Sequence, residues 1–177
     1  MLVVSFIVSV LAEFSIAYGP AVLRAEAVLS GRVRGRVLFE QSHPASPVRV
    51  TGVIHGLSPG LHGFHVHEFG RLGDQCKDAG PHFNPHNTDH GAPDSPTRHV
   101  GDLGNILASA DGRAEFSFED SVISLSGPQS VLGRALVVHE GADDLGREQN
   151  RESRTTGNAG ARIGCGILGV APHTLIF

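Results

Sequence analysis

The sequence LHGFHVHEFG, residues 61–70, joins the alternation of a β-strand to three histidines within six positions. His65 and His67 are two positions apart, so on a strand their rings project from the same face and can bind one metal ion. His62 is out of phase with this pair, which predicts a structural packing role for its ring. A lone histidine is more often a hydrogen-bonded core or surface residue than a ligand. Three histidines this close together favour a metal site.

The rest of the chain predicts an all-β fold. Its 177 residues suffice for one domain with a sizeable core. The 23 glycines, 10 prolines and 6% aromatic residues indicate many turns between short strands. Alternating apolar and polar residues predict strands in the ranges 25–41, 47–60, 105–120, 133–141 and 162–171. Within 105–120, Asp111-Gly112 separates two alternating runs, which predicts a β-hairpin.

Two long segments interrupt this pattern, Gly70 to Gly104 and Gly141 to Ala161. Loops of this length in a compact domain are commonly functional. A window over residues 62–99 holds seven of the eleven histidines. Three imidazoles and one carboxylate in this part of the chain make a closed set suited to zinc, and binding would order the loop: His82, His90, His99 and Asp102.

His139 ends the predicted strand ALVVHE, far from His65 and His67 in the sequence. A barrel can nevertheless bring the three rings together. Three or four imidazoles with an open coordination position favour a redox-capable copper ion over a second structural zinc ion.

The charge of the chain argues against nucleic-acid binding. Its formal net charge is −4 and its pI is near 6.2. Neutralising phosphates requires a basic surface, and no basic run occurs in the sequence.

The first residues have the pattern of a secretory signal peptide. Leu2 to Ala12 is apolar, and Ser15-Ile16-Ala17 predicts cleavage after Ala17, with the leader extending to about residue 20 at most. The apolar run is short for a transmembrane span. We therefore expect a secreted domain over residues 21–177, without stable membrane association after leader removal. The alternatives are an N-terminal core strand and a membrane anchor formed by an uncleaved leader.

Cys76 and Cys165 are the two cysteines of the chain. In an exported protein they are expected to form a disulfide that stabilises the fold by about 4 to 5 kcal/mol. The alternative is a pair of unrelated buried thiols.

Six motifs resemble those of the copper/zinc superoxide dismutases: GFHVHEFG, GPHFNP, RHVGDLGN, EDSVISLSG, LVVHEGADDLG and TGNAGARIGCG. The likeness runs from about Ala25 to Ala171. It implies an eight-stranded Greek-key β-barrel, an immunoglobulin-like sandwich with two long functional loops. It also implies an antioxidant activity in which copper is alternately reduced and oxidised. Two superoxide anions and two protons then become dioxygen and hydrogen peroxide.

By this resemblance each subunit binds one copper ion and one zinc ion. The implied copper ligands are His65, His67, His82 and His139. The implied zinc ligands are His82, His90, His99 and Asp102. His82 is therefore shared as a bridging imidazolate.

The resemblance also implies the catalytic residues. Arg162 docks superoxide beside copper, and His82 acts with it in catalysis. Asp143 accepts hydrogen bonds from His65 and His90, which fixes the orientation of both rings.

The same resemblance implies that the disulfide between Cys76 and Cys165 ties the first loop to the barrel. It further implies a homodimer, with Phe69 and Gly70 in the contact region. Two routes of copper delivery are compatible with the resemblance: delivery by a chaperone and loading in the secretory pathway.

The second loop departs from the family pattern. It reads GREQNRESRTTGNAG, where relatives often carry paired acids and a lysine. We expect Arg154 to take the place of the lysine and to line the substrate channel with Thr156. The channel should then attract anions with an altered salt dependence. A second departure is the short apolar extension over residues 172–177, which is expected to contact the barrel or a subunit interface.

Two other functions compete with the enzyme. One is a superoxide-dismutase-like domain of a copper chaperone, which typically has cysteine-rich copper motifs or lacks a copper ligand. The other is a secreted structural module that binds zinc without turnover. The filled ligand positions, together with Asp143 and Arg162, favour the enzyme.

Overall fold

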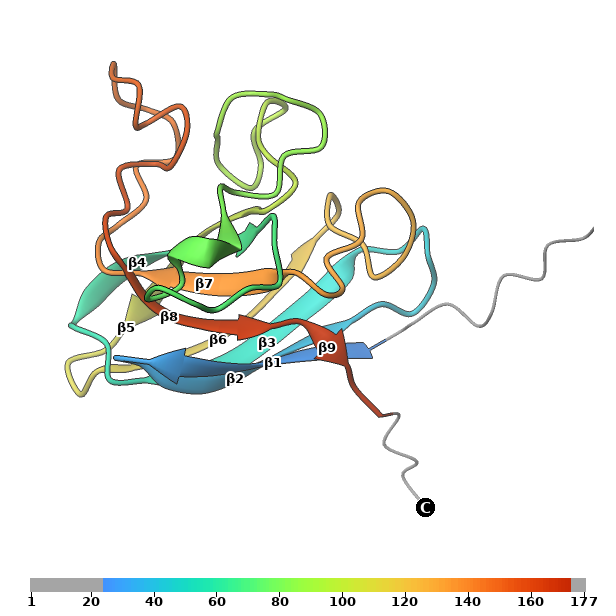
Figure 1. The fold of residues 1–177 in the computed structure, drawn as a ribbon, viewed down its shortest axis with the longest axis horizontal. Coiled ribbons are helices and arrows are strands. Elements are labelled where there is room, and N and C mark those ends of the chain that lie inside the picture. The colour runs from blue at the N-terminus through green and yellow to red at the C-terminus, as the bar shows by residue number, and fades with distance from the viewer. Residues whose placement is uncertain (1–23, 173–177) are drawn as a thin grey trace, which may run out of the picture.

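Strands dominate the computed structural model, which describes residues 24–172 (Figure 1). The predicted signal peptide and residues 173–177 of the predicted C-terminal extension lie outside the described residues. The strands are β1 (Arg24–Gly31), β2 (Arg34–Glu40), β3 (Val48–His55), β4 (Gly60–His67), β5 (Asp102–Ala108), β6 (Arg113–Asp120), β7 (Ala135–His139), β8 (Arg162–Ile167) and β9 (Gly169–Val170).

A short 3₁₀ helix, η1 (Lys77–Ala79), is the one helical element between residues 24 and 172. Over that range no helix is long and apolar enough to cross a membrane. The prediction of an all-β fold is confirmed.

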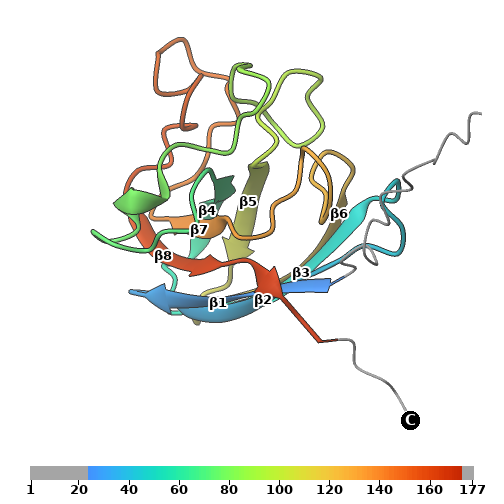
Figure 2. The same ribbon diagram turned by 45° about the vertical axis from the view of Figure 1, so that its right-hand side comes forward.

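The sheet curls into a near-closed antiparallel barrel. Eight strands follow the order β5-β4-β7-β8-β1-β2-β3-β6, and the short β9 pairs with β1 instead. β1 joins the two layers, because it pairs with β2 over most of its length and with β8 at Ser30 and Gly31. Figure 2 shows β1 and β2 on the side of the barrel opposite β4 and β7. The predicted eight-stranded barrel is confirmed.

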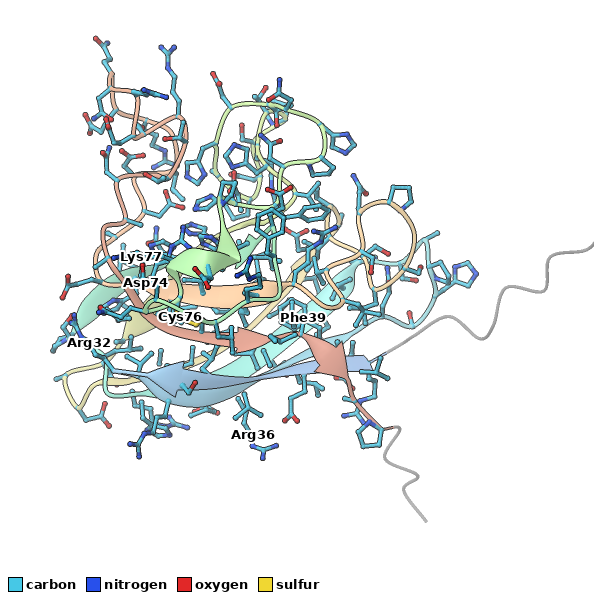
Figure 3. The ribbon with its side chains drawn as sticks, in the orientation of Figure 1. Arg32, Arg36, Phe39, Asp74, Cys76 and Lys77 are labelled. Carbon is cyan, nitrogen blue, oxygen red and sulfur yellow. A yellow bond between two sulfur atoms is a disulfide. The ribbon has the colours of Figure 1, made fainter. Side chains whose placement is uncertain are left out.

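Alternation along the strands fills the barrel with apolar side chains. On β1, Ala25, Ala27 and Leu29 are buried, while the residues between them are not. Figure 3 shows Phe39 of β2 pointing into the barrel, where it is fully buried, and Arg36 of the same strand pointing away from it. Because successive side chains of a strand face opposite sides, one pattern builds both the core and the outer surface.

The predicted hairpin at Asp111-Gly112 is only half right. The turn exists: Gly112 has a φ of +77°, and the N–H of Ser109 donates to the carbonyl of Arg113 at 2.9 Å. β5 and β6 are the two ends of the strand order, however, and no ladder joins them in the described residues. Each strand pairs elsewhere, β5 with β4 and β6 with β3, so the turn passes from one layer to the other.

Both faces of β4 are buried, although for different reasons. Phe64 and Val66 face the hydrophobic core. His65 and His67 face the opposite side and are also shielded from solvent. The two long predicted loops rise on that side of the barrel, above β4 and β7 (Figure 1). The histidine pair therefore lies between the barrel wall and the loops.

Candidate metal centre

Four buried histidines converge on one point outside the barrel wall. They come from β4, from the first long loop and from the end of β7, and their candidate ligand atoms all lie within 4.8 Å of one another: His65, His67, His82 and His139. The Nε2 atoms of His67 and His139 are 3.3 Å apart. The structure thus brings His139 to the β4 pair, as predicted for a copper site.

The hydrogen bonds of these rings show which nitrogens are available for a metal. His67 Nδ1–H donates to the carbonyl of Gly80 at 2.8 Å, and His139 Nδ1–H donates to the carbonyl of Gly160 at 3.1 Å. Both rings therefore turn Nε2 inward. The buried His65 Nδ1 has no hydrogen-bond partner among the described residues. This donor set fits a copper ion, which binds imidazole nitrogen readily.

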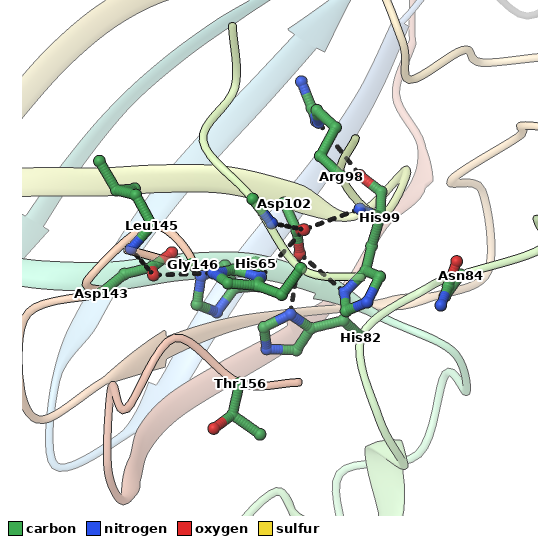
Figure 4. Close-up of polar contacts among 12 residues, drawn as sticks. His65, His82, Asn84, Arg98, His99, Asp102, Asp143, Leu145, Gly146 and Thr156 are labelled. Atoms are coloured by element: carbon green, nitrogen blue, oxygen red, sulfur yellow. Dashed lines mark hydrogen bonds and ion pairs between the residues drawn. The ribbon is translucent and has the colours of Figure 1, made fainter. Parts of the chain in front are cut away.

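The second set surrounds the carboxylate of Asp102 (Figure 4). Its Oδ1 atom lies 2.8 Å from His82 Nδ1 and 3.1 Å from His99 Nδ1. Its Oδ2 atom lies 2.9 Å from His90 Nδ1, without the geometry of a hydrogen bond. Three Nδ1 atoms and one carboxylate at this spacing, all buried, fit the closed coordination that zinc prefers.

His82 belongs to both sets. Its Nδ1 faces Asp102 in the zinc set, while its buried Nε2 has no hydrogen-bond partner in the described part of the chain. The ring lies between the other two groups, with its centroid 4.0 Å from that of His65 and 5.5 Å from that of His99. One imidazole can therefore offer a nitrogen to each metal.

The carboxylate of Asp143 connects one histidine of the copper set with one histidine of the zinc set. Its Oδ2 accepts from His65 Nε2 at 2.8 Å, and its Oδ1 accepts from His90 Nε2 at 2.8 Å. The side chains of all three residues are fully buried. An acceptor on the far nitrogen fixes the tautomer and orientation of a ligating ring. His65 and His90 are thereby left with Nδ1 as the nitrogen that faces the metal.

Burial keeps the copper-set imidazoles neutral, the form that binds metal. Loss of solvent lowers the pKa of His65 and His67 well below the ordinary value, and neighbouring histidines lower it further. Burial also lowers the pKa of His139 to about 4, and that of His82 despite the attraction of Asp102.

His90 shifts in the opposite direction. Burial lowers its pKa, but the carboxylates of Asp102 and Asp143 outweigh burial and raise it to about 9. Burial opposes ionisation of Asp102 too, yet the close imidazoles of His82, His90 and His99 hold its pKa far below the usual range. The zinc set is therefore electrostatically suited to a cation.

Metal-free protein is expected to lose stability as the pH falls from about 6.5 towards 4. In that window these four histidines bind protons in the unfolded state but stay neutral in the folded state: His65, His67, His82 and His139. Protonation therefore favours unfolding. The contribution of His90 to stability depends on pH in the opposite direction. It is fully present below pH 6.5, and it is lost as the pH rises through about 9 and His90 releases its proton. The melting temperature of metal-free protein should therefore peak near pH 6.5. A melting temperature unchanged between pH 6.5 and 5 would contradict this.

Arg162 is held against the first long loop by backbone carbonyls. Its Nη1 donates to the carbonyl of Cys76 at 2.7 Å, and its Nη2 donates to the carbonyl of Gly80 at 2.6 Å. The Gly80 carbonyl also accepts from His67, so one oxygen orients both the arginine and a copper-set ring. Cys76 forms the predicted disulfide with Cys165, three residues after Arg162.

A cleft of about 620 Å³ opens beside the shared ring. Its lining includes His82, His99, Asp89, Arg134, Arg154 and Thr155. Thr156 is not among the lining residues, and its hydroxyl donates to the carbonyl of Glu152 at 3.1 Å. Arg154 therefore lies beside the shared ring, in a cleft whose lining includes neither Arg162 nor the other histidines of the copper set.

His62 has the separate role that its phase predicted. Its Nδ1–H donates to the carbonyl of His139 at 2.8 Å, and its Nε2 lies 3.2 Å from the Ser58 hydroxyl. It therefore supports the end of β7 rather than offering a nitrogen to the metal sets.

Sequence reasoning missed two supports of the site. Asn105 exchanges two 2.8 Å hydrogen bonds with the backbone of Asp143. Arg98 forms a buried ion pair with Asp120 at 2.6 Å and donates to the carbonyl of His99, which fastens the zinc-set loop to β6. Both residues lie in one quoted motif, RHVGDLGN, but their partners are distant in sequence.

A family model described as copper/zinc superoxide dismutase (SODC) matches residues 33–168. This span includes both histidine sets, Asp143, Arg162 and the disulfide.

Proposed function

Because the chain belongs to the copper/zinc superoxide dismutase family, we propose that it works as an exported homodimer in which Arg162 docks superoxide. Its copper and zinc sites are intact, and its family reaction converts two superoxide anions and two protons into dioxygen and hydrogen peroxide. Held by His65, His67, His82 and His139, copper would supply the redox chemistry by alternating between Cu(II) and Cu(I), and zinc has no redox chemistry of its own. The observation that carries this function is His82, which offers one nitrogen to each metal set.

The chain's own residues have distinct tasks in this reaction. The half-buried guanidinium of Arg162 offers positive charge to the anion while three backbone carbonyls keep it in place. His82 is the second catalytic group, because the nitrogen that it would offer to copper, Nε2, can hold a proton whenever it is not serving as a ligand. The buried copper-set rings donate their other protons to fixed acceptors, so they keep their orientation during turnover.

The function is tested on purified protein, residues 21–177, loaded with copper and zinc. One copper and one zinc per chain, together with superoxide dismutation, are the expected results. Zinc alone after copper supplementation would favour the structural module. Both metals without turnover, and transfer of copper to another apoprotein, would favour the chaperone domain.

Electrostatic attraction of superoxide is assigned in part to Arg154, which lines the cleft beside His82. Arg154→Ala should lower kcat/KM several-fold at low ionic strength and have little effect at high salt, because charges are screened over about 3 Å at 1 M salt. Arg147→Ala is the matched control, since Arg147 lies in the same loop but does not line the cleft. Equal effects of the two variants, or an effect independent of salt, would contradict this role.

The proposed dimer contact is an exposed apolar patch formed by Phe69, Leu72 and Ile167. These side chains are 46%, 37% and 41% exposed, and Gly70 lies against Ile167 and Gly133, which places the segment that follows Phe69 beside Ile167. Such patches mark interaction sites. Phe69→Glu should convert a dimer into a monomer in size-exclusion chromatography with light scattering. Leu107→Glu, at a 65% exposed leucine on β5, should leave the dimer intact.

Export is supported by the apolar run Leu2 to Ala12 and by the disulfide between Cys76 and Cys165, a bond typical of oxidising compartments. Expression of the full chain in secretory cells should place active protein in the medium. N-terminal sequencing of that protein should find cleavage between residues 17 and 21. Retention of the uncleaved chain in the membrane fraction would instead support an anchor.

A further inference from the structure

The carboxylate of Asp143 is constrained on most of its sides. Its oxygens accept from His65 Nε2 and His90 Nε2, and Oδ1 also accepts from the N–H of Leu145 at 2.7 Å. The backbone of Asp143 is held by the side chain of Asn105. These contacts fix the backbone of Asp143 and the hydrogen-bond partners of its carboxylate. The remaining side of Oδ1 is covered by a residue from another segment.

Gly157, in the second long loop, closes that side. A Cβ atom added to Gly157 would overlap Asp143 Oδ1 and would lie 2.6 Å from both Asp143 Cγ and His90 Nε2. Real Cβ atoms essentially never approach other heavy atoms this closely. The carbonyl of Gly157 also accepts from the N–H of Asp144 at 2.8 Å, which ties the two segments together.

We propose that Gly157 is a positioning residue that holds the Asp143 carboxylate against His90 and so sets the orientation of a zinc-set ring. The backbone of Gly157 covers the hydrogen bond between Asp143 Oδ1 and His90 Nε2. The side chains of Asp143 and His90 are both fully buried. A side chain at this position would push Oδ1 away from His90. Because Oδ2 serves His65, the zinc site should be affected more strongly than the copper site.

A second property of Gly157 must be separated from this contact. Its φ of +64° lies in the left-handed region, so any substitution adds backbone strain. Gly127 is a matched control: its φ is +69°, and a Cβ there meets nothing within 4 Å. Gly127→Ala therefore introduces similar strain without a contact to the metal sites.

The experiment compares Gly157→Ala and Gly127→Ala in the full mature chain, with zinc affinity measured by chelator competition. Gly157→Ala should weaken zinc binding by about 10- to 100-fold, the usual effect of disturbing the outer partner of a ligating histidine. Gly127→Ala should leave zinc affinity within about 2-fold of the parent protein, because its added Cβ is far from any outer partner. With Co(II) in the zinc site, the visible absorption bands should shift for Gly157→Ala and not for Gly127→Ala. Equal affinities for the two variants, or unchanged Co(II) bands in Gly157→Ala, would overturn the proposal.

A double-mutant cycle with Asp143→Ala shows whether Gly157 acts through the carboxylate. In the Asp143→Ala background the carboxylate is gone, so Gly157→Ala should weaken zinc binding much less than it does in the parent protein. If Gly157→Ala lowered zinc affinity by the same factor in the parent protein and in Asp143→Ala, the proposal would be overturned. If Gly157→Ala did not fold, soluble yield would replace affinity: rescue by Asp143→Ala supports the proposal, and absence of rescue contradicts it.

Discussion

His139→Ala is expected to remove copper and superoxide dismutation together while leaving one zinc bound per chain. His139 contributes one of four converging imidazoles to the copper set and none to the zinc set. Disturbing only the outer partner of a ligand typically costs about 10- to 100-fold in metal affinity or activity. Loss of a ligand itself should exceed that, with activity reduced by at least about 100-fold.

The measurement is metal content and initial rate of dismutation on the same preparation. His55→Ala is the control, because His55 is an exposed histidine at the end of β3, away from the metal sets. It should retain both metals and full activity. Copper at one per chain in His139→Ala, or more than a tenth of the parent activity, would contradict the assigned copper site.

Removal of the disulfide should produce the largest loss of stability. Cys76 and Cys165 are 89 residues apart, so the bond restricts a long loop in the unfolded chain, which corresponds to about 4 to 5 kcal/mol. The double variant Cys76→Ala/Cys165→Ala avoids a free thiol and isolates this effect. The free energy of unfolding of the metal-free protein should fall by that amount in urea titrations. A decrease below about 1 kcal/mol would contradict the prediction.

The same variant should also impair substrate docking. Asp74, Gln75 and Cys76 all have left-handed backbone conformations, with φ values of 44°, 53° and 69°. Such non-glycine residues cost about 1 to 3 kcal/mol each and persist when the surrounding structure fixes them. Without the disulfide this turn can relax, and it carries one of the carbonyls that hold Arg162. We expect a higher KM in the variant as well as a lower stability.

The sequence predicted the ligands of the metal centre better than their orientation. Spacing placed His65 and His67 on one face of a strand, and residue type grouped His90 and Asp102 with the zinc set. Which ring nitrogen faces each metal depends on distant carbonyls such as that of Gly80. Every residue has a backbone carbonyl, so the sequence does not mark which carbonyl will accept from a histidine. The orientation of each ring is therefore known only from the folded structure.

Tertiary pairing also overrode a local signal. Asp111-Gly112 does form a turn, but β5 and β6 bond to β4 and β3 instead of to each other. The placement of the second loop had a similar limit. Arg154 lines the cleft beside His82, and the hydroxyl of Thr156 donates to the carbonyl of Glu152 in its own loop; both facts depend on how the loop folds back on itself, which a sequence motif does not specify.

The alternation along β4 links the accuracy of folding to metal binding. Phe64 and Val66 face the core, while His65 and His67 face the metal sets. A shift of one residue in the pairing of β4 would exchange these faces, placing imidazoles in the hydrocarbon core and two large apolar side chains on the outside. A chain paired in the wrong register would therefore lose both its core and its copper site. Copper binding by this protein consequently requires that β4 has paired in the correct register.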